Sequence, residues 1–182
     1  MGMAAPVYYT ADMVRTFPDD SNRYETVHGE LLVTPSPRAW HQLVLGRLHV
    51  ALANYLESES VGVVLQSPAD ISWSDDTLVQ PDLFVVELSE ARSLDWSRMR
   101  TLLLVIEVLS PSTARHDRFS KRRLYQEQQI PLYWIVDPDL QRVEIWRPNL
   151  EFPELEAGRL TWQTTAAEMP FTVDLMELFK PI

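Results

Sequence analysis

The sequence predicts an α/β domain in which a mixed β-sheet is flanked by helices. Three observations carry this prediction: a helical spacing of apolar residues over 37–57, a nearly continuous apolar stretch over 101–110, and a mixture of helical and strand-like segments along the chain. Such an apolar strand is typical of the centre of a sheet covered on both faces. The order of helix, several strands, helix and two strands fits a mixed sheet against which helices pack.

The chain has 182 residues, enough for one sizeable core, and we expect a single domain over 1–182. Hydrophobic residues make up 46% and charged residues 23%, as in ordinary soluble proteins. Neither end has the pattern of a signal peptide. The longest apolar runs, such as 102–106, are far shorter than the ~20 residues that span a bilayer. We therefore expect a cytoplasmic protein without a membrane partner.

The first third of the chain predicts two helices separated by a hairpin. Thr10 is a suitable N-cap for a short helix over "ADMVRTF", which Pro18 would end. "RYETVHGELLVTP" follows and predicts two strands hinged near His28 and Gly29. From 37 to 57 the apolar residues recur at helical spacing, which indicates an amphipathic helix.

The middle of the chain predicts a series of strands. "VGVVLQ" (61–66), "DISW" (70–73) and "QPDLFVVE" (80–87) are strand-like, whereas 88–100 is polar and irregular. "TLLLVIEVLS" (101–110) is the most apolar stretch and predicts the central strand.

The last third begins with a predicted helix over 115–129, which Pro131 would stop. "LYWIVD" (132–137) and "RVEIWRP" (142–148) predict two strands joined by a turn. "LTWQT" and "DLMELF" predict a last strand and a short terminal helix.

Composition excludes several kinds of site. The chain has no cysteine, so disulfides, thiolate zinc sites and cysteine nucleophiles are ruled out, and any metal must be bound by oxygen or imidazole. The formal net charge of −10 argues against a protein that coats nucleic acid non-specifically, since such binding depends on many Lys and Arg residues. A local basic surface remains compatible with this charge.

Glu107 lies near the end of the apolar stretch and needs an explanation. Burying an unpaired carboxylate costs several kcal/mol, so Glu107 requires a proton, a cationic partner or a metal. Asp82 begins the preceding core strand, and the two carboxylates side by side would suit Mg²⁺ or Mn²⁺. The carbonyl of Val108 is a candidate for a further ligand.

Lys121 lies on the helix that follows this strand. It and Lys180 are the only lysines, although the chain contains many arginines. A lysine near a metal can orient the attacking water and offset negative charge that develops on a phosphate. This pattern suggests a specific need for a compact ammonium group.

Three quoted segments together resemble the PD-(D/E)XK nuclease superfamily, in particular its Uma-type branch of restriction-endonuclease-like proteins: "QPDLFVV", "LLLVIEVLSPST" and "DRFSKRRLYQEQQIPLYWIVDP". "RYETVHGELLVTPSP" and the following His41 resemble the N-terminal part of that branch, so the similarity spans about 22–148. The resemblance implies a restriction-endonuclease-like mixed sheet flanked by helices, a divalent metal (Mg²⁺ or Mn²⁺) and hydrolysis of DNA phosphodiesters. By analogy it also suggests a homodimer.

The resemblance also implies roles for individual residues. Asp82 matches the aspartate of the PD motif, and Glu107 matches the acidic residue of (D/E)XK. Leu109 stands where the superfamily has its lysine, and Lys121 matches a lysine moved to the next helix. Glu30, in "HGEL", matches an acidic residue that such nucleases often add near the site.

Each candidate also has a plainer interpretation. Glu107 could form a buried ion pair without metal, Lys121 could pair only with Asp117 four residues earlier, and Glu30 could face solvent. His41 is a candidate for a residue that contacts a metal ligand rather than the metal. Basic residues on the predicted helix could bind phosphates or form an ordinary solvated face; they are Arg115, Arg118, Arg122 and Arg123.

Two functions from different classes follow. The first is a metal-dependent endonuclease in which Asp82 and Glu107 hold the metal while Lys121 positions or polarises the water. The second is a catalytically inactive module that keeps the nuclease fold for binding or regulation.

Overall fold

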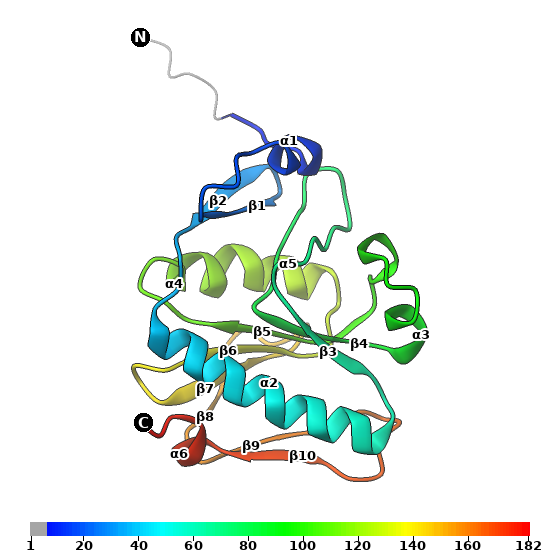
Figure 1. The fold of residues 1–182 in the computed structure, drawn as a ribbon, viewed down its shortest axis with the longest axis vertical. Coiled ribbons are helices and arrows are strands. Elements are labelled where there is room, and N and C mark those ends of the chain that lie inside the picture. The colour runs from blue at the N-terminus through cyan, green and yellow to red at the C-terminus, as the bar shows by residue number, and fades with distance from the viewer. Residues whose placement is uncertain (1–6) are drawn as a thin grey trace.

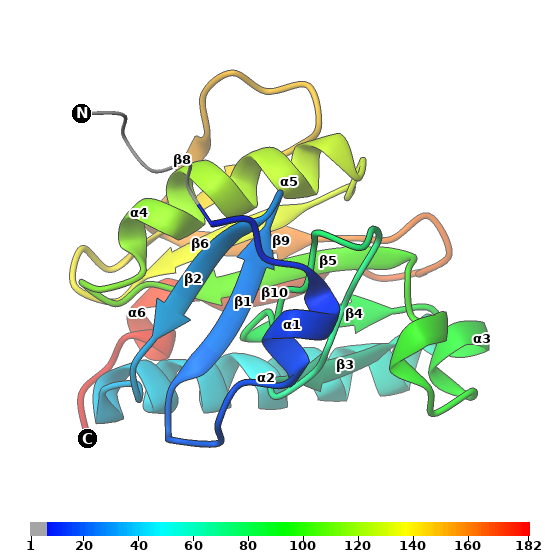
Figure 2. The ribbon, with the colours of Figure 1, turned by 90° about the horizontal axis from the view of Figure 1, so that it is seen from above.

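A computed structural model describes residues 7–182, which form a single mixed α/β domain. A six-stranded sheet lies in the middle, with one long helix across one face and a second helical segment across the other (Figure 1). Seen from above, an N-terminal hairpin and a short helix lie over the sheet on the side of the second segment (Figure 2). This architecture confirms the predicted fold class.

The strands have the following bounds: β1 Arg23–Val27, β2 Glu30–Thr34, β3 Val63–Gln66, β4 Leu83–Val86, β5 Leu102–Val108, β6 Tyr133–Asp137, β7 Arg142–Trp146, β8 Glu154–Glu156, β9 Arg159–Trp162 and β10 Phe171–Asp174. The helices have the following bounds: α1 Ala11–Arg15, α2 Ala39–Glu59, α3 Leu88–Ala91, α4 Ala114–His116, α5 Arg122–Glu127 and α6 Leu175–Leu178. A 3₁₀ turn covers Trp96–Arg98, and a π-helical turn, Asp117–Lys121, joins α4 to α5.

The main sheet has the strand order β3-β4-β5-β6-β7-β8. Only β5 and β6 are parallel, and the other neighbours are antiparallel, so the sheet is mixed. Parallel neighbours need a crossover connection, which the α4–α5 segment provides. That segment consequently covers the sheet directly above β5.

Both faces of the sheet are buried, as the apolar sequence of β5 predicts. Alternate residues of β5 point to opposite faces. Leu104 and Ile106 pack on the α2 side, with Leu48 and Leu52 of that helix. Val105 packs on the opposite side, in the cluster that contains Leu124 of α5. Glu107, two residues after Val105, therefore faces the α4–α5 segment.

Several predicted elements are confirmed. Thr10 caps α1, because its side chain accepts a hydrogen bond from the Met13 amide. The hairpin turns at His28 and Gly29, both with positive φ. The long helix over 37–57 is α2, and its buried positions keep the predicted spacing.

Other expectations differ from the structure. "DISW" (70–73) is not a strand of the sheet, because Ile71 makes one isolated bridge to Val79 within the long loop before β4. The stretch 88–100 contains the short helix α3 and a 3₁₀ turn. The predicted regular helix over 115–129 is interrupted by the π-helical turn. Two short strands, β8 and β10, were not expected, because each has only three or four residues and is fixed by pairing with β7 and β9.

Over the described residues 7–182, no helix is both long enough and apolar enough to cross a bilayer.

We predict that Leu52→Ala on α2 lowers the free energy of unfolding by about 2–5 kcal/mol, since it leaves a cavity in the core. Leu52 is 0% exposed, whereas Val50 on the same helix is 61% exposed. Val50→Ala is the matched control and should change stability by no more than about 0.5 kcal/mol. Chemical denaturation of both variants measures the difference, and equal losses would contradict the assigned orientation of α2.

Candidate functional site

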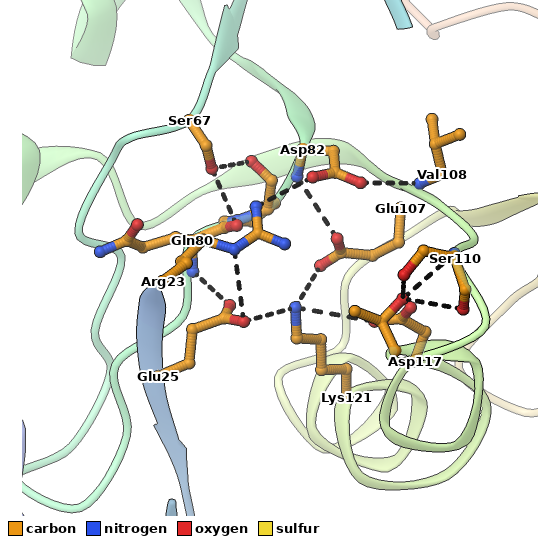
Figure 3. A network of polar contacts seen from close by, with 12 residues as sticks. Arg23, Glu25, Ser67, Gln80, Asp82, Glu107, Val108, Ser110, Asp117 and Lys121 are labelled. Carbon is orange, nitrogen blue, oxygen red and sulfur yellow. Dashed lines mark hydrogen bonds and ion pairs between the residues drawn. The ribbon is translucent and has the colours of Figure 1, made fainter. Parts of the chain in front are cut away.

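Strand register brings Asp82 and Glu107 together. Leu83 of β4 pairs with Ile106 of β5 in antiparallel register, so the next pair along the ladder is Asp82 opposite Glu107. Their side chains lie on the same face, and the Asp82 amide lies 3.4 Å from Glu107 Oε2. The structure thus places the two predicted carboxylates side by side (Figure 3).

Asp82 is buried and makes three polar contacts through its carboxylate. Oδ1 accepts a hydrogen bond from Arg23 Nη1 at 2.9 Å. Oδ2 accepts from the Val108 amide at 2.9 Å and lies 3.1 Å from His41 Nε2. The Arg23 and His41 contacts outweigh the effect of burial and hold the pKa of Asp82 well below its usual range, so Asp82 is ionised at neutral pH.

Lys121 lies at the centre of the network and is only 1% exposed. Its Nζ is 2.9 Å from Glu107 Oε1 and 2.9 Å from Glu25 Oε2. The predicted partner Asp117 is farther away, at 3.7 Å. Tyr125, one turn after Lys121, also donates to Glu107 Oε1 at 3.2 Å. Lys121 is therefore directed at the carboxylate pair and not merely at its helical neighbour.

The π-helical turn holds both Asp117 and Lys121 on its buried side. Single π-helical turns are rare and are frequent at functional sites. Here the Tyr133 hydroxyl donates to the Asp117 carbonyl, which fixes the turn against β6. The sequence does not mark this irregularity, because the segment contains no Pro or Gly that would interrupt a regular helix.

The buried cluster carries more negative than positive charge. Its carboxylates are Glu25, Asp82, Glu107 and Asp117, and its permanent cations are Arg23 and Lys121. Counting these four carboxylates and two cations, the fully ionised cluster has two negative charges in excess. Such an imbalance in a buried site favours a bound divalent cation or a proton.

Burial and the excess of negative charge also affect Glu107, whose pKa rises from 4.5 to about 8. Burial is the main cause, and the negative charges of Asp82, Asp117 and Glu25 add to it, together outweighing Lys121. Burial likewise raises the pKa of Asp117 to about 6. Lys121 shows the opposite effect, since its carboxylate neighbours overcome burial and raise its pKa. Lys121 therefore stays protonated.

A cleft of about 790 Å³ gives access to this cluster. Asp82, Val108, Arg23 and His41 line it. Glu107 lies behind Asp82 and is 1% exposed. A ligand that enters the cleft reaches Asp82 first.

Glu30 is placed elsewhere. It pairs with Val27 at the turn end of the hairpin, whereas Glu25 pairs with Leu32 farther along. Glu30 is consequently exposed, and its carboxylate accepts a hydrogen bond from Ser120 at 3.3 Å. The expectation that Glu30 joins the cluster is not met, because it lies too close to the turn.

Glu25 takes the place that was expected for Glu30. It is fully buried, and its Oε1 accepts a hydrogen bond from the Gln80 amide at 2.7 Å, in the loop that leads to Asp82. The sequence contained a usable signal, since the two-residue period of a strand puts Arg23 and Glu25 on one face. Neither Arg23 nor Glu25 was identified as a site residue from the sequence.

The basic residues of the α4–α5 segment are directed mainly at other partners. Arg118 pairs with Asp137 and Glu144 on β6 and β7. Arg122 lies over the Trp146 ring, 4.8 Å from its centroid. Arg115 is exposed beside a separate hollow that Glu30 also lines. The structure does not bring these three arginines to the carboxylate pair.

The donor set fits a hard divalent cation in charge and chemistry. Within residues 7–182, no three histidine or carboxylate groups already converge as a ready-made metal site. Asp82 and Glu107 are nevertheless adjacent, and among the described residues Glu107 Oε2 has only the long 3.4 Å contact with the Asp82 amide. Oxygen donors with surplus negative charge are the ligands that Mg²⁺ and Mn²⁺ prefer.

We predict that the metal-free protein loses stability as the pH rises from about 5 to about 8. Over this range the folded state binds more protons at Glu107 than the unfolded state, so the free energy of unfolding falls with pH. The fall in wild type should exceed that in Glu107→Gln by at least about 1 kcal/mol. Denaturation in EDTA at each pH measures it, with the exposed Glu57→Gln as control. Parallel profiles for wild type and Glu107→Gln would disagree with the raised pKa.

Comparisons with known proteins show the fold and the family of the chain. A solved structure described as a putative nuclease belonging to DUF820, from Anabaena variabilis ATCC 29413, superposes with a TM-score of 0.73. The two chains are 20% identical, and the match covers 94% of this chain and 97% of the other, which shows a common fold. No curated protein matches the chain. The profile of the Uma2 family, described as "Putative restriction endonuclease", matches residues 11–172, and the chain therefore belongs to the Uma2 family.

Proposed function

We propose that this protein is a metal-dependent endonuclease that hydrolyses DNA phosphodiester bonds. The observation that supports it most is the pair Asp82 and Glu107 at adjacent strand positions, with the Lys121 ammonium 2.9 Å from Glu107. Membership of the Uma2 family supports the nuclease class. DNA as substrate, and a cytoplasmic location, follow from the resemblance and the composition.

Asp82, Glu107 and the carbonyl of Val108 would hold Mg²⁺ or Mn²⁺ in this proposal. When bound, the ion would supply Lewis-acid polarisation of the scissile phosphate and lower the pKa of a coordinated water. Asp82 lines the cleft, and Glu107, which lies behind it, would contribute the second carboxylate. His41 would orient Asp82 through the 3.1 Å contact with Oδ2.

Lys121 would act as a fixed positive charge. Its pKa is raised by the surrounding carboxylates, so it cannot serve as a general base at neutral pH. An ammonium group that remains protonated can donate a hydrogen bond to the attacking water and offset charge on the phosphate. Glu25 and Glu107 hold it in place, which makes the charge preorganised.

A non-catalytic binding or regulatory module is the second candidate. Its support is the net charge of −10 together with the engagement of Arg118 by Asp137 and Glu144, which leaves that arginine less available for phosphates. A homodimer is a further proposal, since two sites related by a two-fold axis could cut both strands. Sedimentation of the purified protein tests the dimer.

We predict that supercoiled plasmid is cleaved in Mg²⁺ or Mn²⁺ and that Lys121→Ala reduces the rate by at least about 100-fold, because a preorganised charge is lost. Asp82→Asn should be at least as impaired. Glu30→Gln is the matched control, because Glu30 lies outside the cluster, and should cleave at the wild-type rate. Linear DNA and RNA tested in parallel define the substrate. If wild type and Lys121→Ala are equally inert on all three substrates, the non-catalytic module is favoured.

We also predict that wild type binds Mn²⁺ in a calorimetric titration and that Glu107→Gln weakens the binding at least about tenfold, since one of two carboxylate ligands becomes neutral. Glu57→Gln, on the exposed side of α2, controls for a general loss of charge. Unchanged affinity in Glu107→Gln would exclude this carboxylate as a ligand.

A further inference from the structure

Arg23 lies between the carboxylates of the cluster, on the side of Asp82 that faces the cleft. It extends from β1, its Nη1 is 2.9 Å from Asp82 Oδ1, and its Nε is 3.7 Å from Glu25 Oε2 (Figure 3). Both Arg23 and Asp82 line the cleft. A guanidinium group therefore holds one of the oxygen atoms to which a metal ion entering from the cleft would bind.

The charge of Arg23 is strongly coupled to the site. Burial by itself would lower the pKa of Arg23, but the negative charges of Glu25, Asp82 and Glu107 outweigh it and raise the pKa. Arginine remains charged at every physiological pH. Arg23 consequently supplies a positive charge to the same three carboxylates that would attract a divalent ion.

The two cations of the cluster are held very differently. Lys121 is 1% exposed and has two carboxylate partners at 2.9 Å. The side chain of Arg23 is 20% exposed, and within residues 7–182 its one side-chain hydrogen bond is to Asp82. Its Nε is buried and has no hydrogen-bond partner among the residues that the structure describes. Leaving Asp82 would cost Arg23 one charge-assisted hydrogen bond and the 3.7 Å ion pair with Glu25, and would let the unsatisfied Nε reach water.

We propose that Arg23 is an internal counter-ion. In the free protein it pairs with Asp82, and it moves away from Asp82 into the cleft when a divalent ion binds there. This inference rests on the proposed metal-dependent function and deepens it. Two positive groups on one carboxylate repel each other, so the ion and Arg23 compete for Asp82. Once released, the guanidinium is free to hold a phosphate oxygen of the substrate, a group that it matches in geometry.

Removing the charge of Arg23 is the direct test. We predict that Arg23→Met binds Mn²⁺ at least about tenfold more tightly than wild type in a calorimetric titration, because its competitor is absent. Arg15→Met is the matched control, since Arg15 lines the same cleft but pairs with Asp12 and Asp70, and should bind Mn²⁺ like wild type. Unchanged or weaker binding in Arg23→Met would overturn the inference.

A second measurement is made on the wild-type protein and uses a variant only to assign one signal. The Nε–H group of Arg23 is buried, so its NMR signal should be protected from solvent exchange in the free protein. Arg23→Lys, which keeps the charge, identifies this signal by its loss. Saturation with diamagnetic Mg²⁺ should abolish the protection. Protection that persists in the Mg²⁺-bound protein would mean that Arg23 stays on Asp82.

Phosphate contact is tested separately in Ca²⁺, which is used to hold the site without cleavage. Arg23→Met should bind a short DNA oligonucleotide at least about fivefold more weakly than Arg23→Lys, because only the lysine can pair with a phosphate. Equal binding would remove the phosphate-contact part of the inference.

Asp82→Asn separates this inference from the proposed function. If Asp82→Asn binds Mn²⁺ as tightly as wild type, the proposed metal site itself is wrong. If Asp82→Asn loses Mn²⁺ binding while Arg23→Met does not gain affinity, the metal site stands and only the role of Arg23 fails.

Discussion

The structure around the site depends on the burial of Lys121 between Glu107 and Glu25. Each of these groups would be costly to bury alone, and breaking such a pair leaves an uncompensated charge in the interior. The three residues come from three different elements: the crossover helix, the central strand and the N-terminal hairpin. One ammonium group thus ties the hairpin and the helix to the same face of the sheet, with the cleft formed beside it.

The sheet supplies the other half of the site. Antiparallel register fixes Asp82 opposite Glu107, and the parallel pairing of β5 with β6 requires a crossover segment that carries Lys121 over the same face. Backbone hydrogen bonds therefore set the relative positions of these groups, while the π-helical turn and Tyr133 adjust the approach of the lysine. Positioning by strands and a packed helix gives the precision that a preorganised site needs.

The side chains of the cluster do not neutralise one another's charge. Four carboxylates face two permanent cations, and the raised pKa values of Glu107 and Asp117 express the resulting cost. Lys121 is buried between carboxylates, whereas Arg23 lies at the cleft and, among the described residues, is held by one hydrogen bond to Asp82 and a 3.7 Å ion pair with Glu25. The site thus combines one fully buried cation with one partly exposed cation at the cleft.

The sequence by itself determined the fold class, the long helix α2, the central strand and the association of Asp82, Glu107 and Lys121. These features follow from local periodicity, from the cost of a carboxylate in an apolar strand and from a resemblance carried by contiguous segments. Tertiary structure placed Glu25 rather than Glu30 in the cluster, because only the packing of the hairpin over the sheet shows which acidic residue faces Lys121. It also decided the partners of Arg23 and Arg118, since a long flexible side chain can reach several carboxylates and only packing selects among them.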